Sequence, residues 1–342
     1  MSEFGPLARI MVAVLGLSVT AAGCSNTAAP PSQSTQVTLE LGWVQAMSFT
    51  AFGATAQALQ MEDDSDLRIE LIPFRSSSDV LLALINGDID MGTIGFAAVA
   101  SALTKGDVPA KYVAGVSFGY SDLLARTGVS ISSWEDVKGL NVGVTQGSSE
   151  YVKLTVAMAS HGLSLVEDTQ YTNVATAANL SLGLQSGDLD VVVSYAPFSS
   201  QAIVDGYAVA LPALQKDLDE GFVSSTGILV TDAAIAQKSS AIQTFVDMYV
   251  DKVDEFLEDV SAISAAWQGF QDTDPAVVAE AFERVKPSYT MDESLARKVP
   301  PTLVEFEVIS SDTSTELGEM FVYSFLEEAT GLTAAELGAA SD

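Results

Sequence analysis

Residues 84–90 read Leu-Ile-Asn-Gly-Asp-Ile-Asp, and residues 184–190 read Leu-Gln-Ser-Gly-Asp-Leu-Asp. The shared phrase is L-x-x-G-D-[I/L]-D, and each copy follows a helical pattern and precedes an apolar strand. Glycine at this position supplies the left-handed residue that satisfies the last carbonyl groups of a helix. Two copies so far apart predict two similar α/β lobes in one chain. Two lobes that face each other form a cleft, and small molecules bind in clefts.

Strand and helix patterns alternate on both sides of the first copy and again around the second. The expected strands are 37–41, 68–72, 91–94, 111–116, 123–126, 141–144, 171–174 and 191–194. The expected helices are 50–61, 79–86, 97–104, 150–161 and 177–185, with one further turn over 132–139. Strands that alternate with helices predict a mostly parallel sheet, so the expected fold class is α/β.

The pattern changes from Gly221 onward. A long strand is expected over 222–230, and the rest of the chain is almost wholly helical. Residues 241–260 place apolar side chains on one face at helical spacing. Helices that are apolar on one side must pack onto something, and we expect these to cover the first lobe.

The N-terminal residues are typical of an exported protein. Arg9 precedes an uncharged apolar run, 10–22, which is shorter than the roughly 20 residues of a membrane-spanning helix and suits a secretory signal. The run ends Ala-Ala-Gly-Cys, which resembles a bacterial lipobox with Ala21 where Leu is usual. We therefore expect a signal peptide at 1–23, a lipidated Cys24, and a flexible tether at 24–36 that is rich in Pro and Ser. The alternative is an ordinary signal peptide with a chance cysteine.

Composition excludes several classes of function. Fifteen Lys and Arg stand against 45 Asp and Glu, a net charge of −30, which disfavours nucleic-acid binding. Cys24 is the only cysteine, so no disulfide and no thiolate site is expected in the body of the protein. His161 is the only histidine, and it closes a helix, where a cation suits the helix dipole. No catalytic residue, metal or cofactor is expected, and the protein is expected to be a monomer.

Residues 132–202 carry a pattern that resembles a known family. The segment W-E-D-V-K-G-L-N-V-G-V-T-Q-G-S-S-E-Y is followed, about thirty residues later, by L-Q-S-G-D-L-D-V-V-V-S-Y-A-P-F. This is similar to the solute-binding proteins of ABC importers for nitrate, sulfonates, taurine and thiamine-pyrimidine precursors. The segments L-G-W, L-I-P-F-R-S-S-S-D and A-L-I-N-G-D-I-D-M-G-T-I-G resemble the family's first lobe. Tyr195 stands where many members carry Trp, so ligand identity is not transferred.

The resemblance implies a type II periplasmic-binding-protein fold, with two α/β lobes, a ligand cleft between them and C-terminal helices packed on lobe one. Lobe one would comprise 37–122 and 223–342, and lobe two 123–222. The implied hinge crossings, near 121–127 and 219–225, agree with the strands expected at 123–126 and 222–230. The implied partners are an ABC permease with its cytoplasmic ATPase, and the membrane through a lipid anchor at Cys24. The implied location is the periplasm or the outer face of the cytoplasmic membrane.

Ligands in open α/β sheets sit beyond the carboxyl ends of the strands. The candidate ligand-binding residues are those that follow expected strands: Trp43, Gln45, Phe49, Phe74, Arg75, Ser76, Ser77, Gly95, Phe96, Phe118, Tyr120, Gln146, Gly147, Ser148, Ser149, Tyr195 and Pro197. The aromatic members, taken as a set, predict an apolar wall suited to an organic ligand, although any one of them can equally be core.

Two members of this set indicate a specific ligand chemistry. In Gly147-Ser148-Ser149 a helix begins directly after a turn, so N–H groups and hydroxyls can point at an oxyanion. The alternative is plain helix capping by a serine. Arg75 is the fixed cation of these loops and could bind a sulfonate or carboxylate, unless it pairs with a surface carboxylate. Asp122 and Glu150 could meet a ligand amine but are expected on the ordinary surface.

Three functions follow from these observations. The first is a transport receptor for a small organic ligand, with a sulfonate or taurine-like anion favoured. A thiamine-pyrimidine precursor or another aromatic heterocycle remains open. The second is an enzyme similar to a pyrimidine synthase, which the resemblance implies would rely on a His and a Cys-rich iron site that this chain lacks. The third is a sensor subunit that binds the ligand and signals to a membrane kinase.

Overall fold

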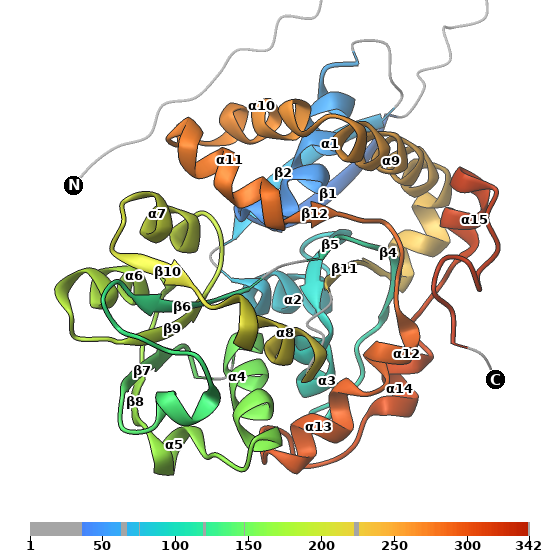
Figure 1. The fold of residues 1–342 in the computed structure, drawn as a ribbon. Coiled ribbons are helices and arrows are strands. Elements are labelled where there is room, and N and C mark those ends of the chain that lie inside the picture. The colour runs from blue at the N-terminus through green and yellow to red at the C-terminus, as the bar shows by residue number, and fades with distance from the viewer. Residues whose placement is uncertain are drawn as a thin grey trace, which may run out of the picture. The chain divides into compact units, whose positions relative to one another are not determined.

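Two five-stranded sheets form the frame of the protein in a computed structural model (Figure 1). The model describes residues 36–62, 67–74, 76–118, 121–146, 148–221 and 226–340, and for residues 118, 220 and 221 the backbone only. Within this part of the chain, no helix is both long and apolar enough to cross a membrane.

The first sheet has the strand order β2-β1-β3-β11-β4. Its strands are β1 (Val37–Val44), β2 (Leu67–Phe74), β3 (Met91–Gly95), β4 (Ala110–Gly115) and β11 (Thr226–Thr231). The strand β1 runs parallel to β2 and β3, and β11 is antiparallel to β3 and β4.

The second sheet has the order β10-β6-β9-β7-β8. Its strands are β6 (Asp122–Arg126), β7 (Asn141–Val144), β8 (Gln170–Asn173), β9 (Val191–Ser194) and β10 (Ala208–Ala210). The strand β7 runs parallel to β8 and β9, and β6 is antiparallel to β9 and β10. The order β8-β7-β9-β6 therefore repeats the order β2-β1-β3-β11, with the same strand directions. A short pair, β5 (Ser117–Phe118) and β12 (Lys286–Pro287), lies outside both sheets.

Helices follow most strands and then dominate the C-terminal third. The α-helices before β11 are α1 (Thr50–Gln60), α2 (Ser77–Asn86), α3 (Phe96–Leu103), α4 (Ser149–Ser160), α5 (Leu165–Asp168), α6 (Ala177–Ser186), α7 (Phe198–Val204) and α8 (Pro212–Gly221). Those after it are α9 (Asp232–Glu258), α10 (Val260–Phe270), α11 (Pro275–Arg284), α12 (Glu293–Ala296), α13 (Val299–Glu305), α14 (Ser314–Gly318) and α15 (Ser324–Thr330). Two short 3₁₀ turns are η1 (Met47–Phe49) and η2 (Trp134–Val137).

The duplicated phrase has the same structural role in both sheets. Gly87 ends α2 and Gly187 ends α6, with φ of 77° and 84°, a left-handed conformation that glycine adopts at little cost. The aspartate three residues later ties the turn to the neighbouring strand. Asp90 accepts a hydrogen bond from the Glu40 N–H of β1 at 2.9 Å, and Asp190 accepts one from the Asn141 N–H of β7 at 3.0 Å.

Each of these aspartates also pairs with a cation from a distant part of the sequence. Lys238 of α9 lies 2.7 Å from Asp90, and Arg126 of β6 lies 2.6 Å from Asp190. In both sheets, the aspartate of the repeat therefore links the end of a helix to a central strand and to a basic residue on a third element.

Side chains alternate between the two faces of the second sheet, as the period of two in a strand requires. Leu123, Val191 and Val193 lie in one apolar cluster with residues of α4, α5 and α8. Leu124 and Val192 lie in the other, with residues of α6 and α7. Helices thus cover both faces of this sheet.

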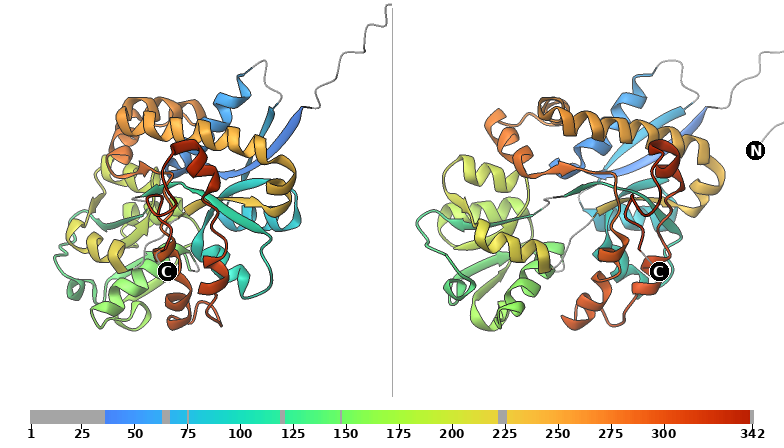
Figure 2. Two further views of the ribbon diagram at one scale, coloured as in Figure 1. Left: turned by 90° about the vertical axis from the view of Figure 1, so that its right-hand side faces the viewer. Right: turned by 45° about the vertical axis from the view of Figure 1, so that its right-hand side comes forward.

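The C-terminal helices pack on the first sheet. Phe245 and Tyr249 of α9, Trp267 of α10 and Phe282 of α11 belong to the same apolar cluster as the strands of that sheet. Figure 2 shows α9, in light orange, passing over the blue strands. The predicted packing of these helices on the first lobe is confirmed.

The predicted lobe boundaries at 122/123 and 222/223 stay a prediction, because residues 36–342 group by their contacts as one unit.

Candidate ligand-binding site

The parallel strands of the second sheet end at one edge, and the predicted serine loop lies there. Ser148 follows β7 and caps α4, since its hydroxyl accepts a hydrogen bond from the Tyr151 N–H at 3.2 Å. Ser149 is the first residue of the helix. The N–H of Gln146 donates to the Asn173 side chain at the end of β8, at 2.9 Å. The helix cap, which the sequence offers as the alternative to oxyanion binding, is present. The first N–H groups of this twelve-residue helix are directed at the same edge.

Tyr195 and Pro197 follow β9 at the same edge. The Tyr195 ring packs against Phe198 at 5.9 Å, edge to face. Burial raises the pKa of Tyr195, and the negative charge of Glu150 raises it further. Pro197 follows a cis peptide bond and caps α7.

The corresponding edge of the first sheet carries Ser76 and Ser77, which open α2. The Ser76 hydroxyl accepts from the Asp79 N–H at 3.2 Å and donates to the Asp79 carboxylate at 2.9 Å. Ser77 is half-buried, as is Phe74 at the end of β2, which packs against the apolar cluster. At the carboxyl edge of each sheet, therefore, a helix begins whose N-terminus is capped by a serine.

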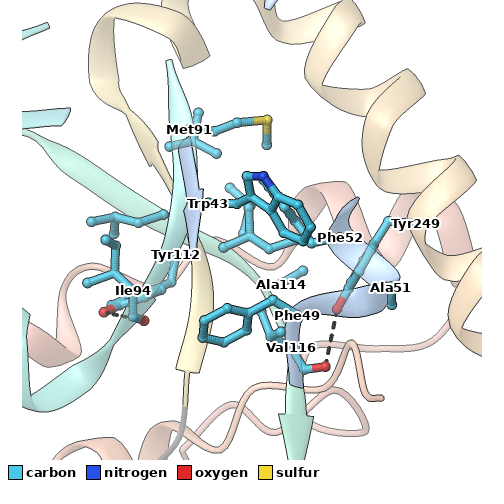
Figure 3. Packing of buried hydrophobic residues seen from close by; sticks show 14 of the residues in the cluster. Trp43, Phe49, Ala51, Phe52, Met91, Ile94, Tyr112, Ala114, Val116 and Tyr249 are labelled. Atoms are coloured by element: carbon cyan, nitrogen blue, oxygen red, sulfur yellow. Dashed lines mark hydrogen bonds between the residues drawn. The ribbon is translucent and has the colours of Figure 1, made fainter. Parts of the chain in front are cut away.

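Three predicted aromatic residues lie in the core of the first lobe. Trp43, Phe49 and Phe96 are at most 4% exposed. The Trp43 ring lies 4.8 Å from that of Phe270, and Figure 3 shows Trp43 and Phe49 in the interior with Phe52. Phe96 packs edge-on against Tyr112 and Phe321. Burial in the apolar cluster accounts for the three aromatic rings without a ligand.

The remaining predicted residues fall into two groups. Gln45 is exposed and donates a hydrogen bond to the Phe270 carbonyl at 3.0 Å, and Gly95 caps α3. Arg75, Tyr120, Gly147 and Cys24 lie outside the described residues, as does the side chain of Phe118.

The expectation that Glu150 and Asp122 lie on the ordinary surface is wrong. They are 6% and 8% exposed. The first turn of α4 packs beneath the segment that enters β6, so the Ser121 hydroxyl donates to Glu150 at 3.3 Å. Asp122 is covered by α11, whose Arg284 donates to it at 2.8 Å. Both contacts join segments distant in sequence, so local patterns carry no sign of them.

Several buried hydroxyls at these edges were missed. Within the described residues, three that lack a hydrogen-bond partner are those of Ser48, Ser117 and Ser194. Ser48 lies just beyond β1, Ser117 just beyond β4, and Ser194 ends β9. Unpaired buried hydroxyls call for an explanation, and strand-end position is the sequence signal that could have found them.

Two hollows on the surface lie away from these edges. One, of about 540 Å³, lies between α9 and α15, and the other, of about 430 Å³, lies along α6. No predicted site residue lines either of them. Among the described residues, no cluster of three His, Cys, Asp or Glu side chains could hold a metal ion.

Comparison with known proteins settles the family. The model of the NMT1-like family matches residues 32–268 of the 342-residue chain. The chain belongs to the NMT1-like family. A search of curated proteins finds no match to this NMT1-like protein.

Many solved structures share its fold. The periplasmic aliphatic sulphonate binding protein SsuA of Escherichia coli matches with a TM-score of 0.70 and 19% identity, over 82% of this chain and 91% of that one. The alkanesulfonate-binding protein SsuA of Xanthomonas axonopodis pv. citri, bound to MOPS, matches with a TM-score of 0.68 and 17% identity, over 84% and 98%. A cysteine-to-serine variant of DszB, bound to biphenyl-2-sulfinic acid, matches with a TM-score of 0.62 and 15% identity, over 86% and 99%. The predicted resemblance and the predicted type II periplasmic-binding-protein fold are confirmed.

Proposed function

We propose that this protein is the extracytoplasmic solute-binding component of an ABC importer. It captures a small organic molecule through a sulfonate group, between the carboxyl edges of the two sheets, and delivers it to a membrane permease driven by a cytoplasmic ATPase. The observation that carries the ligand class is the pair of serine-capped helices, α2 and α4, one at the carboxyl edge of each sheet.

Helix N-termini of this kind suit a sulfur oxyanion. The first N–H groups of a helix have no partner within it and carry a partial positive charge, so they bind anions. The hydroxyls of Ser76 and Ser148 lie beside them. The structural relatives agree in chemistry, since two are named for binding sulphonates and a third holds an aromatic sulfinic acid.

The second part of the proposal concerns location. The apolar run at 10–22, the lipobox-like Ala-Ala-Gly-Cys and the polar tether at 24–36 support export and lipidation at Cys24. A lipid anchor at Cys24, followed by this polar segment rich in Pro and Ser, would hold the protein at the outer face of the membrane, where a permease can be reached. Labelling with a fatty-acid analogue in cells, lost in Cys24→Ser, tests this part.

The enzyme alternative receives less support. The DszB variant shows that this fold can hold a sulfinic acid with a cysteine replaced, but this chain has no cysteine after Cys24. His161 lies at the far end of α4 from Ser148, about 20 Å along the helix axis. There it pairs with Asp217 at 2.9 Å. We therefore expect binding without turnover of any ligand.

Calorimetric titration of the purified protein tests the ligand class. The panel holds nitrate, alkyl and aryl sulfonates, taurine, aromatic carboxylates and aminopyrimidines. We expect saturable binding of at least one sulfonate. Saturable binding of aminopyrimidines alone would move the receptor to another ligand class, and no binding at all would contradict the receptor function.

A matched pair of variants tests the role of the α4 cap. Ser148→Ala removes a serine cap at the carboxyl edge, and Ser164→Ala removes the cap of α5, which precedes β8 and so lies at the opposite edge. Each should lower stability by about 1 kcal/mol. Ser148→Ala alone should weaken sulfonate binding. Equal sulfonate affinities in the two variants would mean that the N-terminus of α4 is not part of the binding site.

A further inference from the structure

Glu150 differs from the other buried carboxylates of the described residues. Four acidic side chains there are less than 9% exposed: Asp122, Glu150, Asp190 and Glu293. Three of them pair with an arginine at 2.6 to 2.8 Å. No Lys, Arg or His of the described residues pairs with Glu150, which is the most buried of the four. A buried charge without a partner is costly, and proteins normally pair it.

Its one hydrogen bond does not compensate for this burial. The Ser121 hydroxyl donates to Glu150 at 3.3 Å, whereas a hydroxyl bound to a carboxylate usually lies at about 2.5–2.7 Å. The first turn of a helix favours an acidic residue through the helix dipole. That effect acts equally on an exposed carboxylate, so it gives no reason for the burial.

The surroundings of Glu150 place it beside the ligand edge. Asp122 and Ser194 are register partners in β6 and β9, so Ser121 and Tyr195 flank that pair and share the opposite face of the sheet. This is the face that α4 covers. The charge of Glu150 acts on Tyr195. The Ser121 hydroxyl and the Glu150 carboxylate thus meet here, and Tyr195 lies next to Ser121 on the same face of the sheet.

The same corner meets the first lobe. Val152, two residues beyond Glu150, and Ala196, next to Tyr195, both belong to the apolar cluster of the first sheet and its helices. Residues two apart on a helix face opposite ways, and Glu150 shares its face of α4 with Leu154, which packs in the core of the second lobe. Glu150 therefore lies where that core reaches the edge that carries the Ser148 cap, and Val152 and Ala196 bring the first lobe against the same corner.

We propose that Glu150, with Ser121 and Tyr195, forms a subsite for a protonated amino group, so that the ligand is a zwitterion with an ammonium close to its sulfonate. This inference rests on the proposed function and narrows it. An oxyanion at the N-terminus of α4 lies within one helical turn, about 5.4 Å along the axis, of Glu150. A purely anionic ligand brings two like charges together there. An ammonium beside the oxyanion instead supplies the cation that Glu150 lacks among the described residues.

Matched ligands test the subsite on the wild-type protein. Calorimetry compares 2-aminoethanesulfonate and 3-aminopropanesulfonate with 1-propanesulfonate and 1-butanesulfonate, which have similar chain lengths and no amine. We expect at least one aminosulfonate to bind roughly ten- to a hundredfold more tightly, as a hydrogen-bonded charge pair implies. Equal or tighter binding of the alkanesulfonates would overturn the subsite and leave the transport function standing. Binding of no sulfonate would overturn both.

A charge-matched pair of variants assigns the effect to one residue. Glu150→Gln keeps the shape of the side chain and removes its charge, and Glu167→Gln makes the same change at an exposed position of α5. We expect the preference for the aminosulfonate to vanish in Glu150→Gln and to persist in Glu167→Gln. Thermal unfolding of both variants verifies that they are folded. A preference that survives in folded Glu150→Gln would place the amine elsewhere and overturn the subsite.

Discussion

Arg284, the last residue of α11, donates two hydrogen bonds to Asp122, the first residue of β6, at 2.8 and 3.1 Å. The pair joins a C-terminal helix packed on the first sheet to the strand that enters the second sheet. Arg284 also pairs with Glu280, one turn earlier in α11. The register partner of Asp122 is Ser194, so this contact lies on the face of the second sheet opposite to Glu150.

Removing Arg284 should destabilise the protein. Arg284→Ala leaves Asp122 buried without its cation, a change that costs 3–5 kcal/mol at fully buried pairs. The Arg284 side chain is 31% exposed, so solvent screens part of the effect and we expect a loss of about 2 kcal/mol at pH 7. Urea unfolding measures this loss. In an Asp122→Asn background, the same substitution should cost much less.

The loss should depend on pH with a definite sign. Burial raises the pKa of Asp122, and Arg284 opposes that rise. Without Arg284 the pKa rises further above its unfolded value, so the folded variant binds a proton more readily than its unfolded chain. The cost of Arg284→Ala should be full at neutral pH and shrink as the pH falls through the pKa of Asp122. A cost independent of pH would contradict this origin.

The two repeat glycines offer a test of backbone conformation alone. Gly87 and Gly187 have positive φ, and a Cβ added to either would touch nothing within 4 Å. Gly87→Ala and Gly187→Ala should each lower stability by about 1 kcal/mol because alanine is strained in this conformation. Gly106→Ala is the control, since that glycine also has open space but no positive φ. Thermal unfolding should show no loss for Gly106→Ala.

The repeat also shows which structural features can be predicted from the sequence and which cannot. It predicts Gly87 and Gly187 correctly as helix ends, because the requirement for a left-handed residue is local. The role of Asp90 is not local. Its cation, Lys238, lies 148 residues away, and only the packing of α9 brings the two together. The alternation of strands and helices predicts the fold class. No helix is predicted for α7, which has only seven residues, or for α8, although Leu214 and Leu218 keep a helical spacing there.

The candidate site likewise has one feature that local sequence predicts and one that it does not. The Ser148 cap is predictable from a serine directly before a helical pattern, and the structure shows it. The burial of Glu150 is not, because the residue that covers it, Ser121, belongs to a crossing segment 29 positions earlier. An acidic residue at a helix start has the same local pattern whether it is solvated or enclosed.

A second pH-dependent effect comes from the capping box of η2. Hydrogen bonds from the backbone and hydroxyls of Ser132 and Ser133 hold the pKa of Asp136 at about 2, below its ordinary value of 3.8. The carboxylate therefore stabilises the fold above about pH 4, and this contribution is lost as the pH falls toward 2. Asp136→Asn should lower the melting temperature at pH 7, and the gap to wild type should narrow below pH 4.

The neighbouring Glu135 provides the control for Asp136. It is exposed and pairs with Lys138 at 2.7 Å on the surface, a kind of ion pair that contributes little. Glu135→Gln should leave the melting temperature nearly unchanged at every pH. A gap for Asp136→Asn that stays constant from pH 7 to pH 2 would show that the carboxylate charge is not what the capping box uses.

Two buried tyrosines allow the contribution of a hydroxyl hydrogen bond to stability to be compared with that of burial alone. Tyr249 and Tyr112 are both 0% exposed, and Figure 3 shows both hydroxyls directed at backbone carbonyls. The Tyr249 hydroxyl lies 2.9 Å from the Gly115 oxygen and 3.1 Å from that of Ser288. The Tyr112 hydroxyl has only a long contact of 3.4 Å, to Ile94. Tyr249 thereby ties α9 to the segment that leads from β4 to the first crossing.

Tyr249→Phe should therefore cost about 1–3 kcal/mol, because it leaves buried carbonyl groups without their donor, and Tyr112→Phe should cost clearly less. Urea unfolding compares the two. Amide exchange locates the effect, since the Ser288 N–H donates to the Val116 carbonyl at 3.0 Å beside the Tyr249 hydroxyl. That amide should exchange faster in Tyr249→Phe and at the wild-type rate in Tyr112→Phe. Equal losses in both variants would mean that the hydroxyl does not hold this segment, and that α9 is secured to it by apolar packing alone.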